Sequence, residues 1–118
     1  MCIRDSPKGI AGEEKACQYL KKHHWHIIKR NWHCRFGEID IIASKNNLLV
    51  FFEVRCRGSS AFGGAAESIT RSKLEKLKRS ANFYLTMYPT EQLVRLDALL
   101  LENGLLQRVR HIANISEN

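Results

Sequence analysis

The sequence predicts an α/β domain in which helices flank a mixed β-sheet, in the order helix, three strands, helix, two strands. Apolar residues recur at helical spacing in two segments and alternate or run continuously in five others. A long helical segment separates the third strand from the fourth, which suits a right-handed crossover between parallel neighbours. The chain has 118 residues, the size of one domain. Residues 1–8 show no periodicity and are expected to be an unstructured extension, so the domain is expected to span residues 9–118.

Two segments have the periodicity of helices. A first helix is expected from Gly9 to His23, because Glu13, Cys17 and Leu20 recur at i, i+4 and i+7. A second helix is expected from Ala66 to Tyr88, where a proline follows and ends it. Its inward-facing side chains are expected to be those of Ile69, Leu77, Ala81, Tyr84 and Leu85.

Five segments are expected to be strands. The second and third form a hairpin around Asn46 and Asn47, since asparagine tolerates the left-handed backbone of a tight turn. The sequence GSSAFGGA, residues 58–65, is expected to be a small flexible loop. The expected strands are His26–Phe36, Glu38–Ser44, Leu48–Arg57, Leu93–Leu101 and Leu105–Ile112.

The charge balance favours a polyanionic partner. The net charge is +7, so nucleic acid is the first candidate and an anionic membrane surface a weaker one. No apolar run approaches the roughly 20 residues of a membrane span, and no secretory signal is expected at the N-terminus. Four scattered cysteines without a CxxC pair indicate a reducing, cytoplasmic location. The HHWH segment lacks the usual spacing of zinc ligands and is read as a surface segment that closes a helix.

Three carboxylates lie in the predicted hairpin, among residues that otherwise read as core strands. With the turn at Asn46 and Asn47, Asp40 is expected opposite Glu53, and Glu38 opposite Arg55. Like charges directly opposed are destabilising, so either one acid takes up a proton or a cation lies between them. Oxygen ligands of this kind favour Mg²⁺ or Mn²⁺. The structural alternative is that these acids form ordinary ion pairs, such as Glu38 with Arg55.

The two faces of the hairpin are both largely apolar, which indicates central strands covered on both sides. The face of the acids is expected to carry Ile42, Leu49 and Phe51. The opposite face is expected to carry Ile39, Ile41, Val50, Phe52 and Val54.

Two helical residues are expected to point toward the sheet beside these acids. Glu13 shares a helix face with Cys17 and Leu20, although an acid in the first turn of a helix also suits the helix dipole. Lys73 lies four residues from both Ile69 and Leu77, which turns it inward; a lysine with a buried stem and an exposed amine is the alternative.

Several segments, in this order, resemble the YraN-like proteins, an uncharacterised bacterial family with a restriction-endonuclease-like fold. They are GEEKACQYL, NWHCRFGEIDIIA, LLVFFEVRCR with the FGG after it, ITRSKLEKL, VRLDALLL and VRHIANI. The resemblance spans about Gly9 to Ile115 and implies the PD-(D/E)xK nuclease superfamily. It implies that Asp40 is the first hairpin acid, Glu53 the acid of the ExK motif, and Glu13 the additional helix acid found in branched-DNA resolvases.

The resemblance implies a metal-dependent endonuclease that cleaves DNA, with Mg²⁺ or Mn²⁺ held by Asp40, Glu53 and the carbonyl of Val54. A homodimer would suit an enzyme that acts on branched DNA. Arg55 stands where the family motif has lysine; arginine keeps its charge and can hold a phosphate, but it cannot act as a general base. Arg55 and Lys73 are therefore expected to bind the phosphate. The expected contacts to the DNA backbone are those of Arg71, Lys76, Lys78 and Arg79.

Two alternatives stay open at this point. The first is a nucleic-acid-binding module that keeps the nuclease scaffold and has lost the chemistry, with Arg55 as the mark of that loss. The second is an interaction domain whose acids form structural ion pairs. Metal binding at Asp40 and Glu53 separates the nuclease from the interaction domain, and cleavage separates the nuclease from the binding module.

Overall fold

The computed structural model describes residues 7–57, 70–102 and 108–117. The order of the elements is the predicted one, with a short 3-10 helix added at the C-terminal end. The elements are α1 (Pro7–Lys22), β1 (His26–Cys34), β2 (Gly37–Lys45), β3 (Leu48–Arg57), α2 (Arg71–Met87), β4 (Leu93–Glu102), β5 (Arg108–Ile112) and η3 (Ile115–Glu117).

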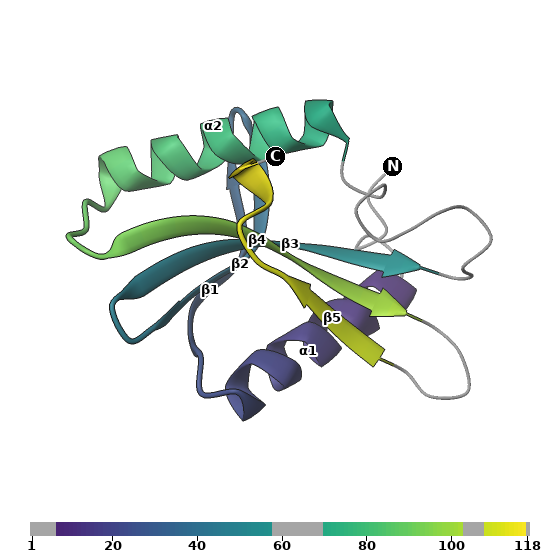
Figure 1. The fold of residues 1–118 in the computed structure, drawn as a ribbon. Helices are drawn as coiled ribbons and strands as arrows, with labels where there is room; N and C mark the ends of the chain where they lie inside the picture. The colour runs from purple at the N-terminus through teal and green to yellow at the C-terminus, as the bar shows by residue number, and fades with distance from the viewer. Residues whose placement is uncertain (1–6, 58–69, 103–107, 118) are drawn as a thin grey trace.

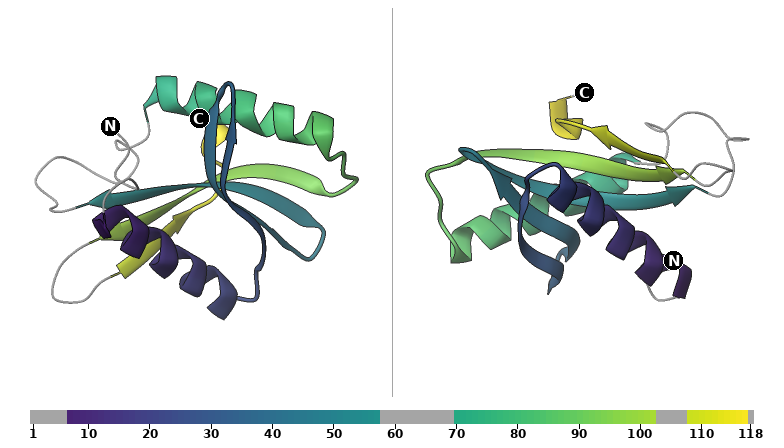
Figure 2. Two further views of the ribbon diagram at one scale, coloured as in Figure 1. Left: turned by 180° about the vertical axis from the view of Figure 1, so that it is seen from behind. Right: turned by 90° about the horizontal axis from the view of Figure 1, so that it is seen from below.

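The five strands form one mixed sheet in the order β1-β2-β3-β4-β5. Neighbours are antiparallel except β3 and β4, which are parallel, as the long connection through α2 predicted. The two helices cover opposite faces of the sheet, α2 on one side and α1 on the other (Figures 1 and 2). The fold is therefore the expected α/β arrangement with the sheet between two helices, and β1 and β5 are its edges.

The helix boundaries differ from the expected ones at their N-terminal ends. Helix α1 begins at Pro7, so Pro7 and Lys8 are helical although the sequence placed them in an unstructured extension. Proline is well suited to the first turn of a helix, where its missing N–H has no partner to lose. Residues 1–6 lie outside the described residues.

Helix α2 is capped by Thr70, whose Oγ1 accepts a hydrogen bond from the Lys73 N–H over 3.1 Å. The expected start at Ala66, the residue Ile69 and the loop 58–65 lie outside the described residues. Within α2 the predicted inward face is confirmed, since Leu77, Ala81 and Tyr84 are buried and Leu85 packs against them.

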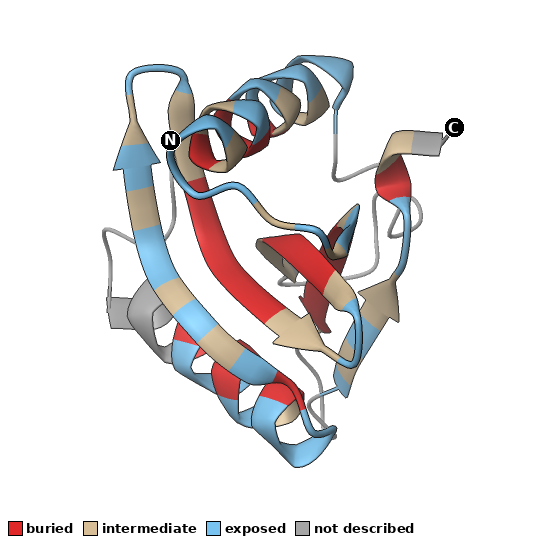
Figure 3. Cartoon of the chain, turned by 90° about the vertical axis from the view of Figure 1, so that its left-hand side faces the viewer, coloured by how far each residue is buried: buried red, intermediate tan, exposed pale blue. Residues whose placement is uncertain are grey.

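The β2–β3 hairpin has the predicted register. Ile41 pairs with Phe52 and Lys45 with Leu48, around a turn in which Asn46 has a φ of 57°. This left-handed conformation is the one for which asparagine was singled out. Figure 3 shows β2 buried along most of its length.

Strand β1 is less regular than expected and ends at Cys34, short of Phe36. Its pairing with β2 shifts register between Ile27 and Lys29, and Asn31 has a left-handed backbone with a φ of 52°. Its residues alternate between exposed and intermediate except at Arg30 and Asn31, which are both exposed, as suits an edge strand beside a buried one (Figure 3).

The remaining strands agree with the prediction in the part that is described. Strand β4 runs one residue further than expected, to Glu102, and β5 is described from Arg108 to Ile112. The expected start of the last strand at Leu105 lies outside the described residues.

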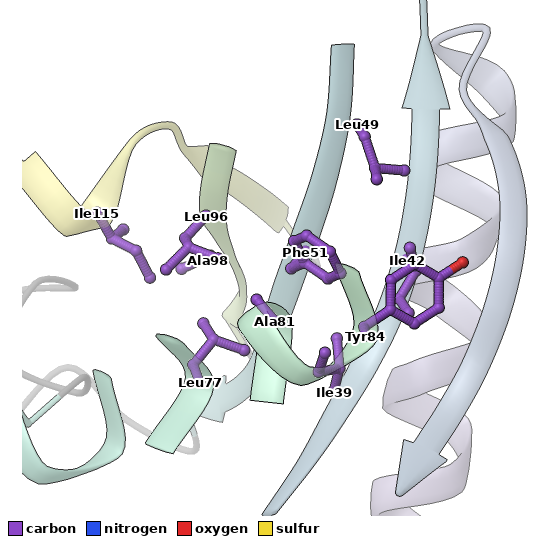
Figure 4. Packing of buried hydrophobic residues seen from close by; sticks show 10 residues of the cluster. All are labelled: Ile39, Ile42, Leu49, Phe51, Leu77, Ala81, Tyr84, Leu96, Ala98 and Ile115. Carbon is purple, nitrogen blue, oxygen red and sulfur yellow. The ribbon is translucent and has the colours of Figure 1, made fainter. Parts of the chain in front are cut away.

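Two hydrophobic clusters fill the two sides of the sheet. The α2 side contains Ile42, Leu49 and Phe51 of the hairpin, packed against Tyr84 and its neighbours (Figure 4). The residues on the α1 side are Ala16, Cys17, Leu20, Trp25, Ile41, Ala43, Val50, Phe52 and Leu99. The predicted division of the hairpin into two faces is thus confirmed for these hairpin residues.

Ile39 is the exception to the predicted faces. It was expected on the α1 side with Ile41, but it belongs to the cluster under α2 (Figure 4). The strict alternation of a strand therefore fails between Ile39 and Ile41, at Asp40. Asn31, with its left-handed backbone, lies on β1 between Arg30, which pairs with Ile41, and Trp32, which pairs with Ile39.

In the parts of the chain described here, neither helix is long and apolar enough to cross a membrane.

Candidate functional site

Asp40 is a carboxylate in the middle of the sheet and is only 1% exposed. The recorded pairing of β2 with β3 ends at Ile41 and Phe52, immediately before it. Beyond that pair, Asp40 Oδ2 accepts a hydrogen bond from the backbone N–H of Val54 over 2.7 Å. The carboxylate of Asp40 thus accepts the Val54 N–H in place of the backbone carbonyl of β2 that would accept it in a regular ladder.

Glu53 lies on β3 beside this contact. It follows Phe52 directly and lies on the same strand face as Phe51, toward α2. Its carboxylate Oε2 is 3.6 Å from the Arg55 guanidinium, with side-chain exposures of 17% for Glu53 and 29% for Arg55. The acid and the cation are therefore reachable from solvent, whereas Asp40 is enclosed.

The expected cross-strand ion pair between Glu38 and Arg55 is replaced by other partners. Glu38 Oε1 lies 3.1 Å from Nδ1 of His33 on β1, and Arg55 pairs with Glu53 on its own strand. The register was predicted correctly, but the ladder between β2 and β3 is recorded only up to Ile41 and Phe52. The opposition of Glu38 with Arg55, and of Asp40 with Glu53, lies beyond that last pair and stays a prediction.

Glu13 is buried on α1, as predicted, and faces β1. Its Oε1 accepts a hydrogen bond from Asn31 Nδ2 over 2.7 Å and lies 3.6 Å from the Arg30 guanidinium. Arg30 also reaches Glu14 over 3.2 Å. The helix acid is thus fixed in place by two consecutive residues of the edge strand.

Lys73 does not point inward, contrary to the prediction; its side chain is exposed in the first turn of α2. Residues 73 and 74 are both at helical spacing from Leu77, so either could extend the buried face of the helix. The structure uses Leu74, which is partly buried and packs against the core. The lysine therefore lies at the margin of the buried stripe.

The four basic residues predicted to contact a nucleic-acid backbone lie on α2. Arg71, Lys76 and Arg79 are exposed, while Lys78 is partly exposed and lies 3.8 Å from Glu75. Their role in binding stays a prediction.

The donor atoms of the hairpin suit a hard cation by their chemistry. Asp40 and Glu53 supply carboxylate oxygens, the ligands that Mg²⁺ and Mn²⁺ prefer. Within residues 7–57, 70–102 and 108–117, no three His, Cys, Asp or Glu side chains are grouped so that they could hold a metal ion together. The role of Glu13 as a third acid at such a site therefore stays a prediction.

A third buried carboxylate, Asp97 on β4, escaped the sequence analysis. It is fully buried and accepts two hydrogen bonds from Arg95, both over 2.8 Å, one from the Asn114 N–H over 2.8 Å, and contacts His111 Nε2 over 2.6 Å. Burial alone would raise the pKa of Asp97, but the contacts with His111, Arg95 and Asn114 outweigh it and lower the pKa. The signal in the sequence was the acid within the apolar run LVRLDALLL.

Asn31 was also missed. Its left-handed backbone and its hydrogen bond to Glu13 make it the residue that connects the irregular part of β1 to α1. Asparagine within a predicted strand, where it is disfavoured, was the available signal.

Comparison with known proteins shows the family. The chain matches the uncharacterised protein family UPF0102 over residues 12–101. A UPF0102 protein of Neisseria gonorrhoeae is 45% identical over 98 residues, which cover 82% of this chain and 85% of the relative. A UPF0102 protein of Persephonella marina is 41% identical over 108 residues, which cover 91% of this chain and 90% of the relative. A UPF0102 protein of Syntrophomonas wolfei is 38% identical over 109 residues, which cover 90% of this chain and 94% of the relative. The chain therefore belongs to UPF0102, the YraN-like family that its motifs predicted.

Proposed function

We propose that the protein is a metal-dependent endonuclease that hydrolyses DNA phosphodiesters, with a restriction-endonuclease-like core of the PD-(D/E)xK type. One observation carries the proposal: Asp40 is a nearly enclosed carboxylate that leaves the β2–β3 ladder and binds the Val54 N–H, next to Glu53. A buried acid in a central strand requires compensation for its lost hydration. A metal cation bound by both Asp40 and Glu53 would supply such compensation and would give the two carboxylates a role in hydrolysis.

The Val54 carbonyl supports the same site. In an extended strand the N–H and C=O of one residue point to the same side. Since the Val54 N–H points to Asp40, its carbonyl also faces β2. Asp40, Glu53 and the Val54 carbonyl would hold Mg²⁺ or Mn²⁺, which supplies Lewis acidity toward the phosphate oxygens.

The cations around the acids suit the handling of a phosphodiester. Arg55, 3.6 Å from Glu53 and partly exposed, is placed to bind a phosphate oxygen beside the acids. The exposed Lys73 and the basic residues of α2, Arg71, Lys76 and Arg79, would bind neighbouring phosphates without reading sequence. Glu13, fixed by Asn31 and Arg30, would complete the acid set from α1.

The test is cleavage of supercoiled, single-stranded and four-way-junction DNA with Mg²⁺ or Mn²⁺, comparing the native protein with Asp40→Asn and Glu53→Gln. Glu102→Gln is the matched control, because Glu102 is a partly buried strand acid in an ion pair with Arg110. We expect cleavage by the native protein and the control, and its loss in both hairpin variants. Equal thermal unfolding of the Glu53→Gln variant and the control would separate loss of chemistry from loss of fold.

A second function is favoured by one specific observation, the arginine at the lysine position. Arg55 forms an ion pair with Glu53, so the acid of the motif already has a cationic partner. In this reading the protein is a non-catalytic nucleic-acid-binding module. DNA that is bound but left uncut by the native protein under all metal conditions would support it and contradict the nuclease.

A further inference from the structure

A row of aromatic rings and cations lies where α2 passes the edge strand β1. Rings from α2 meet rings from β1 and from the turn after it. Between ring centroids, Trp32 of β1 lies 5.2 Å from Tyr84 and 6.2 Å from Phe83, and Phe36 of the turn lies 5.8 Å from Phe83. We refer to this row as the aromatic seam; its members are Lys29, Trp32, Arg35, Phe36, Phe83 and Tyr88.

Both charged members of the aromatic seam are cations that stand over its rings. Lys29 Nζ lies 5.4 Å from the centre of the Tyr88 ring. The Arg35 guanidinium lies 5.2 Å from the centre of the Phe36 ring and 5.7 Å from that of Phe83. Such contacts stabilise the cation by the negative face of the ring, and they place positive charge directly beside flat apolar surface.

The rings at the two ends of the seam are not part of the core. Phe36 is 36% exposed and Tyr88 is 43% exposed, whereas Tyr84 between them is buried. Exposed rings interleaved with cations match what a single strand of nucleic acid requires, because bases stack on the rings and phosphates pair with the cations. A base-paired duplex offers only its phosphates to such a surface, since its bases are stacked inside.

The seam continues toward the hairpin acids. Lys76 and Arg79 lie seven and four residues before Phe83, on the same side of α2, and both are exposed. A Cβ built on Gly37, the residue after Phe36, would lie 3.8 Å from Lys76 Cβ, so α2 passes directly over the start of β2. Asp40 follows three residues later, about 10 Å along the strand.

We infer that the aromatic seam binds an unpaired stretch of DNA next to the site at Asp40 and Glu53. The inference rests on the proposed function for its choice of DNA, and it makes the substrate a DNA with a single-stranded segment. The bases of that segment stack on Phe36 and Tyr88 when Lys29 and Arg35 move from the faces of these rings to the phosphates of the strand.

The test is fluorescence anisotropy with labelled (dT)20, a 20-base-pair duplex and (U)20, in EDTA so that nothing is cleaved. We expect Phe36→Leu and Tyr88→Leu, which keep apolar bulk but remove the ring, each to weaken (dT)20 binding by roughly 5-fold or more. Duplex binding should change less than about twofold. Tyr19→Leu is the matched control, since Tyr19 is a partly exposed aromatic on α1 that contacts the ring of His23.

Several results would overturn the inference. Unchanged (dT)20 affinity in both variants would remove the seam from binding, and an equal loss on duplex would remove its preference for unpaired DNA. Tighter binding of (U)20 than of (dT)20 would contradict the choice of DNA. Seam variants that change the sedimentation coefficient but not the affinity would show contacts between two copies of the chain instead.

The result also separates this inference from the proposed function. If Asp40→Asn abolishes cleavage while Phe36→Leu binds (dT)20 normally, the nuclease stands and the seam fails. If the native protein cleaves nothing but loses (dT)20 affinity in the seam variants, the seam stands and the nuclease fails.

Discussion

Asn31 Nδ2 donates a hydrogen bond of 2.7 Å to Glu13 Oε1, joining the edge strand β1 to helix α1. Asn31 does so from a left-handed backbone with a φ of 52°, a conformation that asparagine tolerates better than most residues. Because Glu13 is buried, this bond replaces part of the hydration that its carboxylate loses on folding. Asn31 thus combines an unusual backbone conformation with the hydrogen bonding of a buried acid.

Asn31→Ala and Asn31→Gly separate these two contributions. Both remove the hydrogen bond and should lower the free energy of unfolding by about 1–3 kcal/mol, since a buried acceptor is left behind. The free energy of unfolding of the alanine variant should be about 1 kcal/mol lower than that of the glycine variant, because glycine adopts the left-handed backbone without strain. Urea unfolding at pH 7 measures both values, with Asn82→Ala at an exposed position of α2 as the control. Equal losses of stability in the two variants would show that alanine adopts the left-handed backbone at position 31 without strain.

Asp97 predicts a specific dependence of stability on pH. Its pKa is lowered in the folded protein from an ordinary value of 3.8, because hydrogen bonds to the carboxylate outweigh the effect of burial. The stability that it contributes is therefore fully present above that value and is lost as the pH falls through the folded-state pKa. Asp97→Asn should lower the free energy of unfolding by about 3 kcal/mol or more at pH 7, since Arg95 loses its buried partner.

The measurement is urea unfolding of both proteins between pH 7 and pH 3. The difference between the native protein and Asp97→Asn should be constant from pH 7 to about pH 5 and shrink below about pH 4. Glu102→Gln is the control, because Glu102 forms a more exposed ion pair with Arg110. A difference that grows as the pH falls would contradict the lowered pKa.

The sequence predicted the parts of the fold that depend on local chemistry. The register of the β2–β3 hairpin followed from Asn46 and from the alternation of apolar residues on both strands. The parallel pairing of β3 with β4 followed from the length of the connection between them. Glu13 was predicted to point toward the sheet with Cys17 and Leu20, and Asp40 to lie among the apolar residues of the hairpin, and both are buried.

The features that were missed depend on residues distant in the chain. Asp97 is bound by Arg95, two residues before it on β4, but also by His111 and Asn114, which lie far along the chain and which no local pattern connects to it. The inward orientation of Lys73 was wrong because helical spacing alone leaves two neighbouring positions open to the core, and Leu74 fills that place. Glu38 was weighed only against β3, whereas its partner His33 is the residue paired with it across the β1–β2 ladder.

Gly12 is a position of close approach between α1 and the sheet. A Cβ added there would lie 2.6 Å from Cys56 Sγ and 3.0 Å from Leu101 Cδ1. Gly12→Ala should therefore lower the free energy of unfolding by about 1–3 kcal/mol, despite the better helix propensity of alanine. In the background of Cys56→Ala the sulfur is absent and the loss should be smaller. A double-mutant cycle by urea unfolding measures this coupling; additive losses within about 0.3 kcal/mol would show that the close contact with Cys56 is not the cause.

Arg55 decides between the nuclease and the binding module, since it stands beside Glu53 where the family motif has lysine. If Arg55 binds a phosphate oxygen during cleavage, Arg55→Gln should lower kcat by about 100-fold, the typical effect of removing one donor to developing charge. Arg55→Lys keeps the positive charge and should stay within about tenfold of the native protein. The measurement is single-turnover cleavage with Mg²⁺, and the control is Arg110→Gln, which removes a similar arginine–carboxylate pair on β5. Full activity in Arg55→Gln would exclude Arg55 from the chemistry. An inactive native protein that Arg55→Lys activates would mean that the arginine blocks cleavage on a scaffold that still binds DNA.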